Sequence, residues 1–156
     1  MIFGVFGTAP IPFVRLASAL DRAASELREP VVVQHGHTDF LFRCAQAHAF
    51  LGQVEMAAHI RDASVVVTHG GWGTISECLR AHKPVVAVPR LAGSEHNHDQ
   101  DELVAVLERM NAVIAVRDCA CLEDAIRRAR THVFSWPQRG EAHTTINNFL
   151  RKVFAS

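Results

Sequence analysis

The sequence has no excess of either charge, no cysteine pattern of a metal or disulfide site and no long apolar run. Its 16 Lys and Arg residues balance 16 Asp and Glu residues, so no overall field favours nucleic acid or an anionic membrane. The four cysteines lack C-x-x-C spacing, and no secretory segment precedes the first apolar run, which favours a reducing cytosol. The longest apolar runs are far short of a membrane span. We therefore expect a cytoplasmic protein that reaches a membrane only through a partner.

A complete set of metal ligands is missing as well, although the chain has 10 histidines. His35-x-His37 and His96-x-His98 would each point two rings to one face of a strand. A third ligand at a suitable spacing is absent from the sequence. We therefore expect no metal site, and we interpret Cys119-x-Cys121 as incidental.

Short apolar runs alternate with helical patterns along a chain whose 156 residues suit one domain. The predicted strands cover residues 2–6, 31–34, 65–68, 85–88 and 113–116. The predicted helices cover residues 13–27, 54–63, 74–83, 103–110 and 122–129. This alternation predicts an α/β fold with a doubly wound, mostly parallel, Rossmann-like sheet and helices on both faces.

The end of the chain has a different character. Residues 1–134 form the predicted domain, and residues 135–156 form a linker and a last helix. This helix carries an apolar stripe that includes Ile146, Phe149 and Leu150. The stripe packs either on its own domain or on a partner subunit.

The residues that follow the third buried strand carry the chemistry. Residues 69–74 are glycine-rich and open a helix, so a ligand can approach the backbone, the free amides and the positive end of the helix dipole. His69 and Thr74 add hydrogen-bond donors for phosphate. Glu77, one turn further along the helix, is placed to accept from ribose hydroxyls. The pattern matches neither a Walker loop nor the dinucleotide fingerprint, and it predicts a site for a nucleoside diphosphate.

These residues resemble the nucleotide-sugar-binding half of GT-B glycosyltransferases, and most closely the family 28 C-terminal domain. The motif is His69-Gly70-Gly71-Trp72-Gly73-Thr74-x-x-Glu77, followed by Lys83-Pro84 and Val88-Pro89-Arg90. Three further elements are similar to short, single-domain members of the family. They are Gly7-Thr8 with Pro12-Phe13, Gln34-x-Gly36-x-Thr38, and Glu95-His96 leading to Gln100. Such members are the catalytic subunits of two-subunit UDP-sugar transferases, which make lipid-linked oligosaccharide or exopolysaccharide and transfer N-acetylglucosamine or glucuronic acid. The resemblance covers about residues 1–130.

The resemblance implies a role for each matching residue. The diphosphate would be bound by His69, Gly70, Gly71, Trp72, Gly73 and Thr74, and the ribose by Glu77. The uracil would face Gln53, Val54, Glu55 and Met56, and the donor sugar would face Asn97, His98, Asp99 and Gln100. In many relatives the corresponding order is Asp-His-Gln, so His and Asp are exchanged here. Gly7, Thr8, Gly36 and Thr38 would form a loop on the phosphate or acceptor side.

The resemblance also implies a reaction. A UDP-sugar would be the substrate, no cofactor would be needed, and the anomeric carbon would be inverted. A membrane-anchored subunit at the cytoplasmic face would bind the polyprenyl-linked saccharide acceptor and supply the catalytic base. The alternatives are a stand-alone nucleotide-sugar-binding protein, an epimerase or a phosphohydrolase on the same fold. An epimerase would need a second domain, and a phosphohydrolase would need a metal set or a nucleophile.

Overall fold

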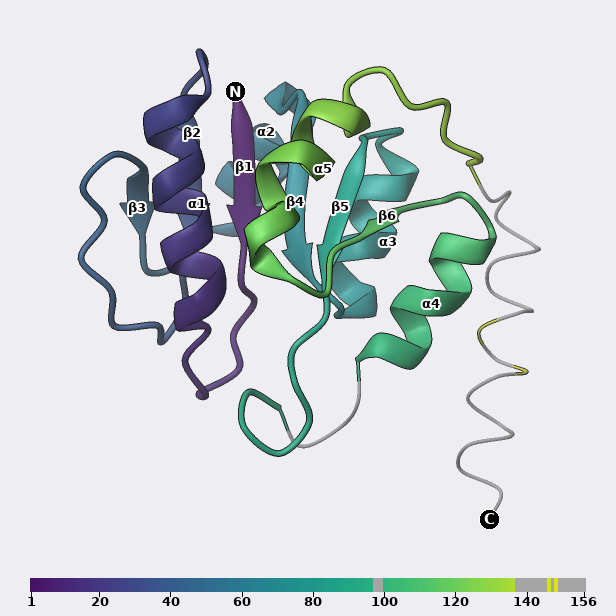
Figure 1. Ribbon diagram of the computed structural model, residues 1–156, viewed down its shortest axis with the longest axis horizontal. Coiled ribbons are helices and arrows are strands. Elements are labelled where there is room, and N and C mark those ends of the chain that lie inside the picture. The colour runs from purple at the N-terminus through teal and green to yellow at the C-terminus, as the bar shows by residue number, and fades with distance from the viewer. Residues whose placement is uncertain (97–99, 137–145, 147, 149–156) are drawn as a thin grey trace.

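Six parallel strands form one open sheet in the computed structural model, and helices cover both faces of the sheet (Figure 1). The structure describes residues 1–96, 100–136, 146 and 148. The strands are β1 (Ile2–Val5), β2 (Val31–Gln34), β3 (Gln46–His48), β4 (Val65–His69), β5 (Val85–Val88) and β6 (Ile114–Ala115). Their order in the sheet is β3-β2-β1-β4-β5-β6. The predicted fold class is confirmed, and every strand pair described is parallel.

The helices divide between the two faces of the sheet. They are α1 (Val14–Glu26), α2 (Gln53–Asp62), α3 (Trp72–Arg80), α4 (Asp101–Arg109) and α5 (Leu122–Ala129), with a 3₁₀ turn, η1, at Cys119–Cys121. Helices α1 and α5 cover one face, where Leu16, Leu20 and Ile126 belong to one core cluster. Helices α2, α3 and α4 contribute Ile60, Ile75 and Leu107 to the cluster on the other face.

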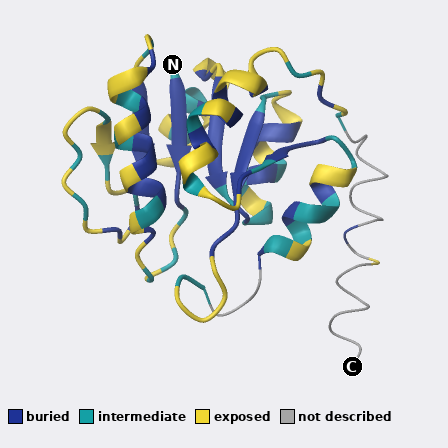
Figure 2. Ribbon diagram, in the orientation of Figure 1, coloured by how far each residue is buried: buried dark blue, intermediate teal, exposed yellow. Residues whose placement is uncertain are grey.

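The central strands were predictable because they are mostly apolar, with polar residues only at the carboxyl ends of β2 and β4. All residues of β1, β2 and β5 are buried, as are the first four of β4, and Figure 2 shows these strands in dark blue. A strand covered on both faces needs no polar alternation. The edge strand β3 was not predicted, since it is short, two of its three residues are polar, and it is largely exposed. It is held by hydrogen bonds to β2 and its extension, including the one from His35 N to His48 O (2.9 Å).

The strand order places a reversal point between β1 and β4. The chain leaves β1 through α1 toward β2, and it leaves β4 through α3 toward β5 on the opposite side. In doubly wound folds, ligands bind beyond the carboxyl ends of the strands at such a reversal point, and we call this place beyond β1 and β4 the crevice. Both strands point to the lower edge of the sheet in Figure 1.

The predicted linker and last helix lie mostly outside the described residues. Of the apolar stripe, only Ile146 is described, and it is helical and buried. The boundary at residue 134 and the surface covered by this helix therefore stay predictions.

Candidate functional site

Loops from four parallel strands meet at the crevice. They begin at Phe6 after β1, at His35 after β2, at Gly70 after β4 and at Pro89 after β5. The loops after β1 and β2 approach each other closely at two glycines, since a Cβ on Gly36 would lie 2.5 Å from Gly7 O. The structure thus brings together four segments to which the sequence analysis assigned site residues.

The imidazole of His69 lies between two glycines at the reversal point. A Cβ on Gly7 would lie 2.7 Å from His69 Cε1, and a Cβ on Gly71 would lie 2.2 Å from His69 Nε2. Both distances are far below van der Waals contact, so only glycine fits at either position. Gly7 also has a φ of 77°, which favours glycine. These two glycines make room for a side chain of the protein itself.

The surroundings of His69 keep its ring neutral. Burial lowers its pKa from 6.5 to about 4, against a smaller opposite effect of the Val5 carbonyl. His69 Nδ1 lies 3.4 Å from Val5 O and 3.3 Å from Thr68 Oγ1, whose hydroxyl donates to Val5 O (3.1 Å). Because Val5 O can only accept, we assign the ring proton to Nδ1. Nε2 is then an acceptor, and at pH 7 the ring brings no positive charge to an anion.

The start of α3 is the part of the motif that opens to solvent. Gly71 is the N-cap and Trp72 the first helical residue, two residues before the predicted start at Thr74. The first amides of a helix have no acceptor within it, so those of Trp72, Gly73 and Thr74 are available to a ligand. Among the described residues, and apart from its chain neighbours and the backbone of its own helix, no atom lies within 4 Å of a Cβ placed on Gly73. The indole of Trp72 packs against the second core cluster, so this residue offers its backbone to the loop.

The predicted ribose-binding and uracil-facing residues lie on two helices. Glu77 is exposed on α3, and α2 begins at Gln53. Val54 is 84% exposed, whereas Met56 packs against the second core cluster. The carboxylate of Glu55 accepts from Gly52 N (2.8 Å) and caps α2.

Phe50 was missed by the sequence analysis. Its ring is half exposed just before α2 and contacts His37 edge-on, with 5.1 Å between ring centroids. An exposed aromatic ring beside the predicted uracil-facing residues is a surface on which a base can stack. The signal was an aromatic residue in the segment that leads into this helix.

Arg90 fixes the loops on the other side of the crevice. Its guanidinium is buried and lies 4.4 Å from the centroid of the Phe13 ring. It donates to Phe6 O (3.0 Å) and Ile11 O (2.8 Å) in the loop after β1, and to Glu95 O (3.2 Å) in its own loop. Burial lowers the pKa of this guanidinium, but its charge is matched by three carbonyl dipoles. Arg90 therefore holds the loops after β1 and β5 together.

Glu95 stabilises the loop after β5, to which it belongs. Its carboxylate accepts from Leu91 N (2.8 Å) and pairs with Arg15, whose Nε lies 2.9 Å from Glu95 Oε1. Arg15 Nη1 also lies 3.3 Å from Cys119 Sγ. Of the residues predicted to face the donor sugar, Asn97, His98 and Asp99 lie outside the described residues. Gln100 is described and buried.

Two residues of the predicted phosphate-side or acceptor-side loop support the backbone. Thr38 is buried, and its Oγ1 accepts from Phe13 N (3.0 Å). Gly36, with a φ of 58°, allows the close approach to Gly7 O. Thr8 is exposed at the rim of the crevice. Whether any of these residues meets a ligand stays a prediction.

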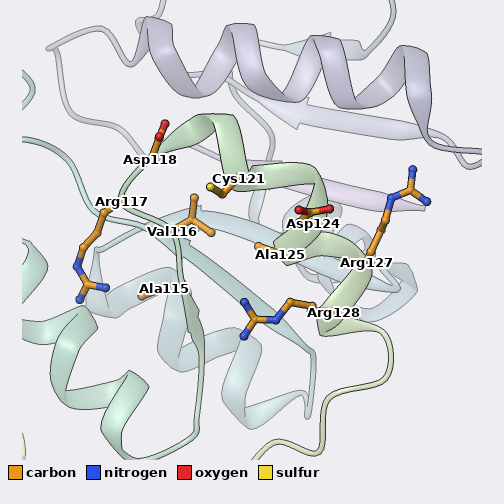
Figure 3. Close-up of a pocket in the computed structure, with 9 residues that line it drawn as sticks. All are labelled: Ala115, Val116, Arg117, Asp118, Cys121, Asp124, Ala125, Arg127 and Arg128. Carbon is orange, nitrogen blue, oxygen red and sulfur yellow. The ribbon is translucent and has the colours of Figure 1, made fainter.

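A cavity of about 470 Å³ lies away from this crevice, between β6 and α5 (Figure 3). Its charged lining includes Arg117, Asp118, Asp124, Arg127 and Arg128. Arg117 pairs with Asp101 and Glu108, and Arg127 pairs with Glu123. None of the predicted site residues lines this cavity. Within the described part of the chain, no three His, Cys, Asp or Glu side chains are grouped as a metal site would require.

Comparisons with known proteins find similarity to glycosyltransferases. Residues 7–152 match the glycosyltransferase family 28 C-terminal domain. The zeaxanthin glucosyltransferase of Pseudescherichia vulneris is 31% identical over 94 residues, which are 56% of this chain and 22% of that protein. The calicheamicin glycosyltransferase CalG4 superposes with a TM-score of 0.60 at 18% identity, over 98% of this chain and 44% of its own. The glycosyltransferase SsfS6 of Streptomyces sp. SF2575, complexed with thymidine diphosphate, superposes with a TM-score of 0.52 at 26% identity. The superposition covers 84% of this chain and 35% of SsfS6. The chain thus spans less than half the length of each of these proteins.

Proposed function

Because the chain belongs to the glycosyltransferase family 28 C-terminal domain family, we propose that it is the donor-binding part of an inverting hexosyltransferase that uses a UDP-sugar. The observation that carries the proposal is the position of the α3 N-terminus. It lies at the reversal point of the sheet, with open space over Gly73 and the exposed carboxylate of Glu77 one turn further on. Amides beside a carboxylate suit a diphosphate linked to a ribose.

The proposed catalytic contribution is electrostatic. Breaking the bond between sugar and diphosphate builds negative charge on the leaving oxygen, and preorganised amides stabilise that charge without reorientation. The amides of Trp72, Gly73 and Thr74 and the helix dipole would supply this stabilisation. A neutral His69 would act by holding the loop in place, since its proton faces Val5 O.

The acceptor side of the reaction is proposed from the resemblance to two-subunit enzymes. A membrane-attached subunit would bind a polyprenyl-linked saccharide of exopolysaccharide or lipid-linked glycan synthesis and would supply the base. Val14, Phe50 and Leu91 lie in the chain beyond the carboxyl ends of β1, β3 and β5, and each is about half exposed (50 to 52%). Such apolar side chains at one edge suit a protein contact. Within the described residues, no helix has the length and apolar character needed to cross a bilayer.

Calorimetric titration with UDP and 2′-deoxy-UDP tests the donor site. If Glu77 accepts from the ribose hydroxyls, wild type prefers UDP by about tenfold, because a hydrogen bond to a charged group contributes about 1.5 kcal/mol or more. Glu77→Ala should remove most of that preference. Glu26→Ala removes an exposed carboxylate at the end of α1 and serves as the matched control. An unchanged preference for UDP in Glu77→Ala would contradict the proposed site. Metal-dependent release of phosphate would favour a phosphohydrolase.

The partner is tested separately with the purified chain. We expect no transfer from a UDP-sugar to a soluble acceptor until the membrane-attached subunit is added. Robust transfer by the chain alone would refute the need for a partner.

A further inference from the structure

The side chain of Gln100 links the loop after β4 to the loop after β5. Its Oε1 accepts from Gly70 N (3.0 Å) and from Arg90 N (3.2 Å). Both partners are N–H donors, so the atom between them must be the amide oxygen. Gln100 is 9% exposed, so these hydrogen bonds are shielded from water. One carboxamide thus sets the distance between two loops of the crevice.

The packing around Gly70 shows that this contact is tight. A Cβ on Gly70 would lie 2.7 Å from Gln100 Cβ and 3.0 Å from Val104 Cγ2. The first glycine of the motif therefore allows the start of α4 to pack closely against the loop. Gly70 directly precedes Gly71, the N-cap of α3. A shift of Gly70 would therefore move the first amides of α3.

The second partner, Arg90, extends the link to a third loop. Its side chain donates to Phe6 O and Ile11 O, which belong to the segment after β1. Gln100 therefore connects the start of α3 with the segments that follow β5 and β1. The amide of Gly70 is already used in this link, so it is not free for a phosphate.

We propose that Gln100 is a positioning residue for the diphosphate loop, an inference that rests on the proposed function. Its oxygen is occupied by two backbone amides, so a bound donor can reach only Nε2. The ligand atom that faces Gln100 must then accept a hydrogen bond. The affinity for UDP itself should depend on Gln100, although UDP carries no sugar to contact.

Calorimetry with Gln100→Met separates positioning from a contact with the sugar. The methionine keeps the length of the side chain and removes the acceptor. We expect the affinities for UDP and for UDP-N-acetylglucosamine to fall by the same factor, about tenfold, since one displaced loop serves both. A residue that only contacts the sugar would weaken UDP-N-acetylglucosamine and leave UDP unchanged, and that result would overturn the inference.

Two further variants show that the effect is local. Leu107→Ala removes a buried side chain from the same helix, α4. This control should lower the stability of the fold without changing the affinity for UDP. Gln100→Glu restores an acceptor oxygen. The hydrogen exchange of the Gly70 and Arg90 amides should be faster in Gln100→Met and slow again in Gln100→Glu.

The failures of the two proposals look different. UDP binding by wild type that is unaltered in Gln100→Met overturns the positioning role and leaves the proposed function standing. Absence of UDP binding in wild type overturns the proposed function and this inference with it.

Discussion

Acidification should destabilise this fold through His69, and the effect can be worked out from its surroundings. Its pKa is about 4 in the folded chain, against 6.5 for an unhindered imidazole. Below about pH 6.5 the unfolded chain therefore takes up a proton at this position, while the folded chain stays neutral. Stability is lost as the pH falls from about 6.5 to about 4, and it is fully present above that range.

The size of the effect follows from the shift in pKa. Each pKa unit corresponds to about 1.4 kcal/mol, so the difference between 6.5 and about 4 gives about 3 kcal/mol. This figure is an upper value, because part of the ring reaches solvent. It is still a large share of the stability of a typical domain, about 5–15 kcal/mol.

The reference for this prediction is His69→Asn. The asparagine amide donates from nearly the position of Nδ1, so it can satisfy Val5 O, and it does not titrate. Urea unfolding at fixed ionic strength, from neutral to acidic pH, gives the free energy of unfolding of both proteins. The difference between them should change by about 3 kcal/mol over that range, and wild type should lose more. A difference that stays constant with pH would refute the neutral, buried state of His69.

Three further substitutions test the start of α3 and the segment that precedes β3. Gly73→Ala should leave the fold as stable or raise its stability by up to about 1 kcal/mol, since among the described residues outside its own helix turn no atom lies within 4 Å of the new Cβ. The same substitution should lower the affinity for UDP, measured by calorimetry. Gly71→Ala places a Cβ 2.2 Å from His69 Nε2, so urea unfolding should show a loss of about 2 kcal/mol or more, partly recovered in the double variant with His69→Ala. Asp21→Asn replaces a carboxylate that accepts from Arg43 N, Cys44 N and Ala45 N by a neutral amide, which weakens these hydrogen bonds. Hydrogen exchange of the three backbone amides should therefore become faster.

The sequence allowed the central sheet to be predicted because burial on both faces leaves a simple pattern. Short β-branched runs such as residues 65–68, followed by glycines, are typical of a parallel strand covered on both faces. The edge strand β3 was harder to predict. Residues 46–48 lack an apolar run, and only their hydrogen bonds to β2 make them a strand. Phe50 was missed for the same reason, since its exposure depends on where this edge lies.

Side chains that link distant loops were beyond the reach of any sequence pattern. Arg90 belongs to the motif by its position, yet nothing in its neighbourhood predicts that it is buried against Phe13 and three carbonyls. The same holds for Gln100, whose partners Gly70 and Arg90 are 30 and 10 residues away. Such contacts follow from the packing of α4 and of the loops, which local periodicity does not encode.

The glycines of the motif show how one pattern can have several physical causes. The sequence analysis assigned Gly70, Gly71 and Gly73 alike to the approach of a ligand. In the structure, the missing side chain of Gly70 leaves room for Gln100, and that of Gly71 leaves room for His69. Of the three glycines, only Gly73 faces open space among the described residues. The first two are therefore needed to assemble the loop, and the third is the one whose missing side chain a ligand can use. This division explains why a spacing of glycines predicts the place of a site better than it predicts the contacts in it.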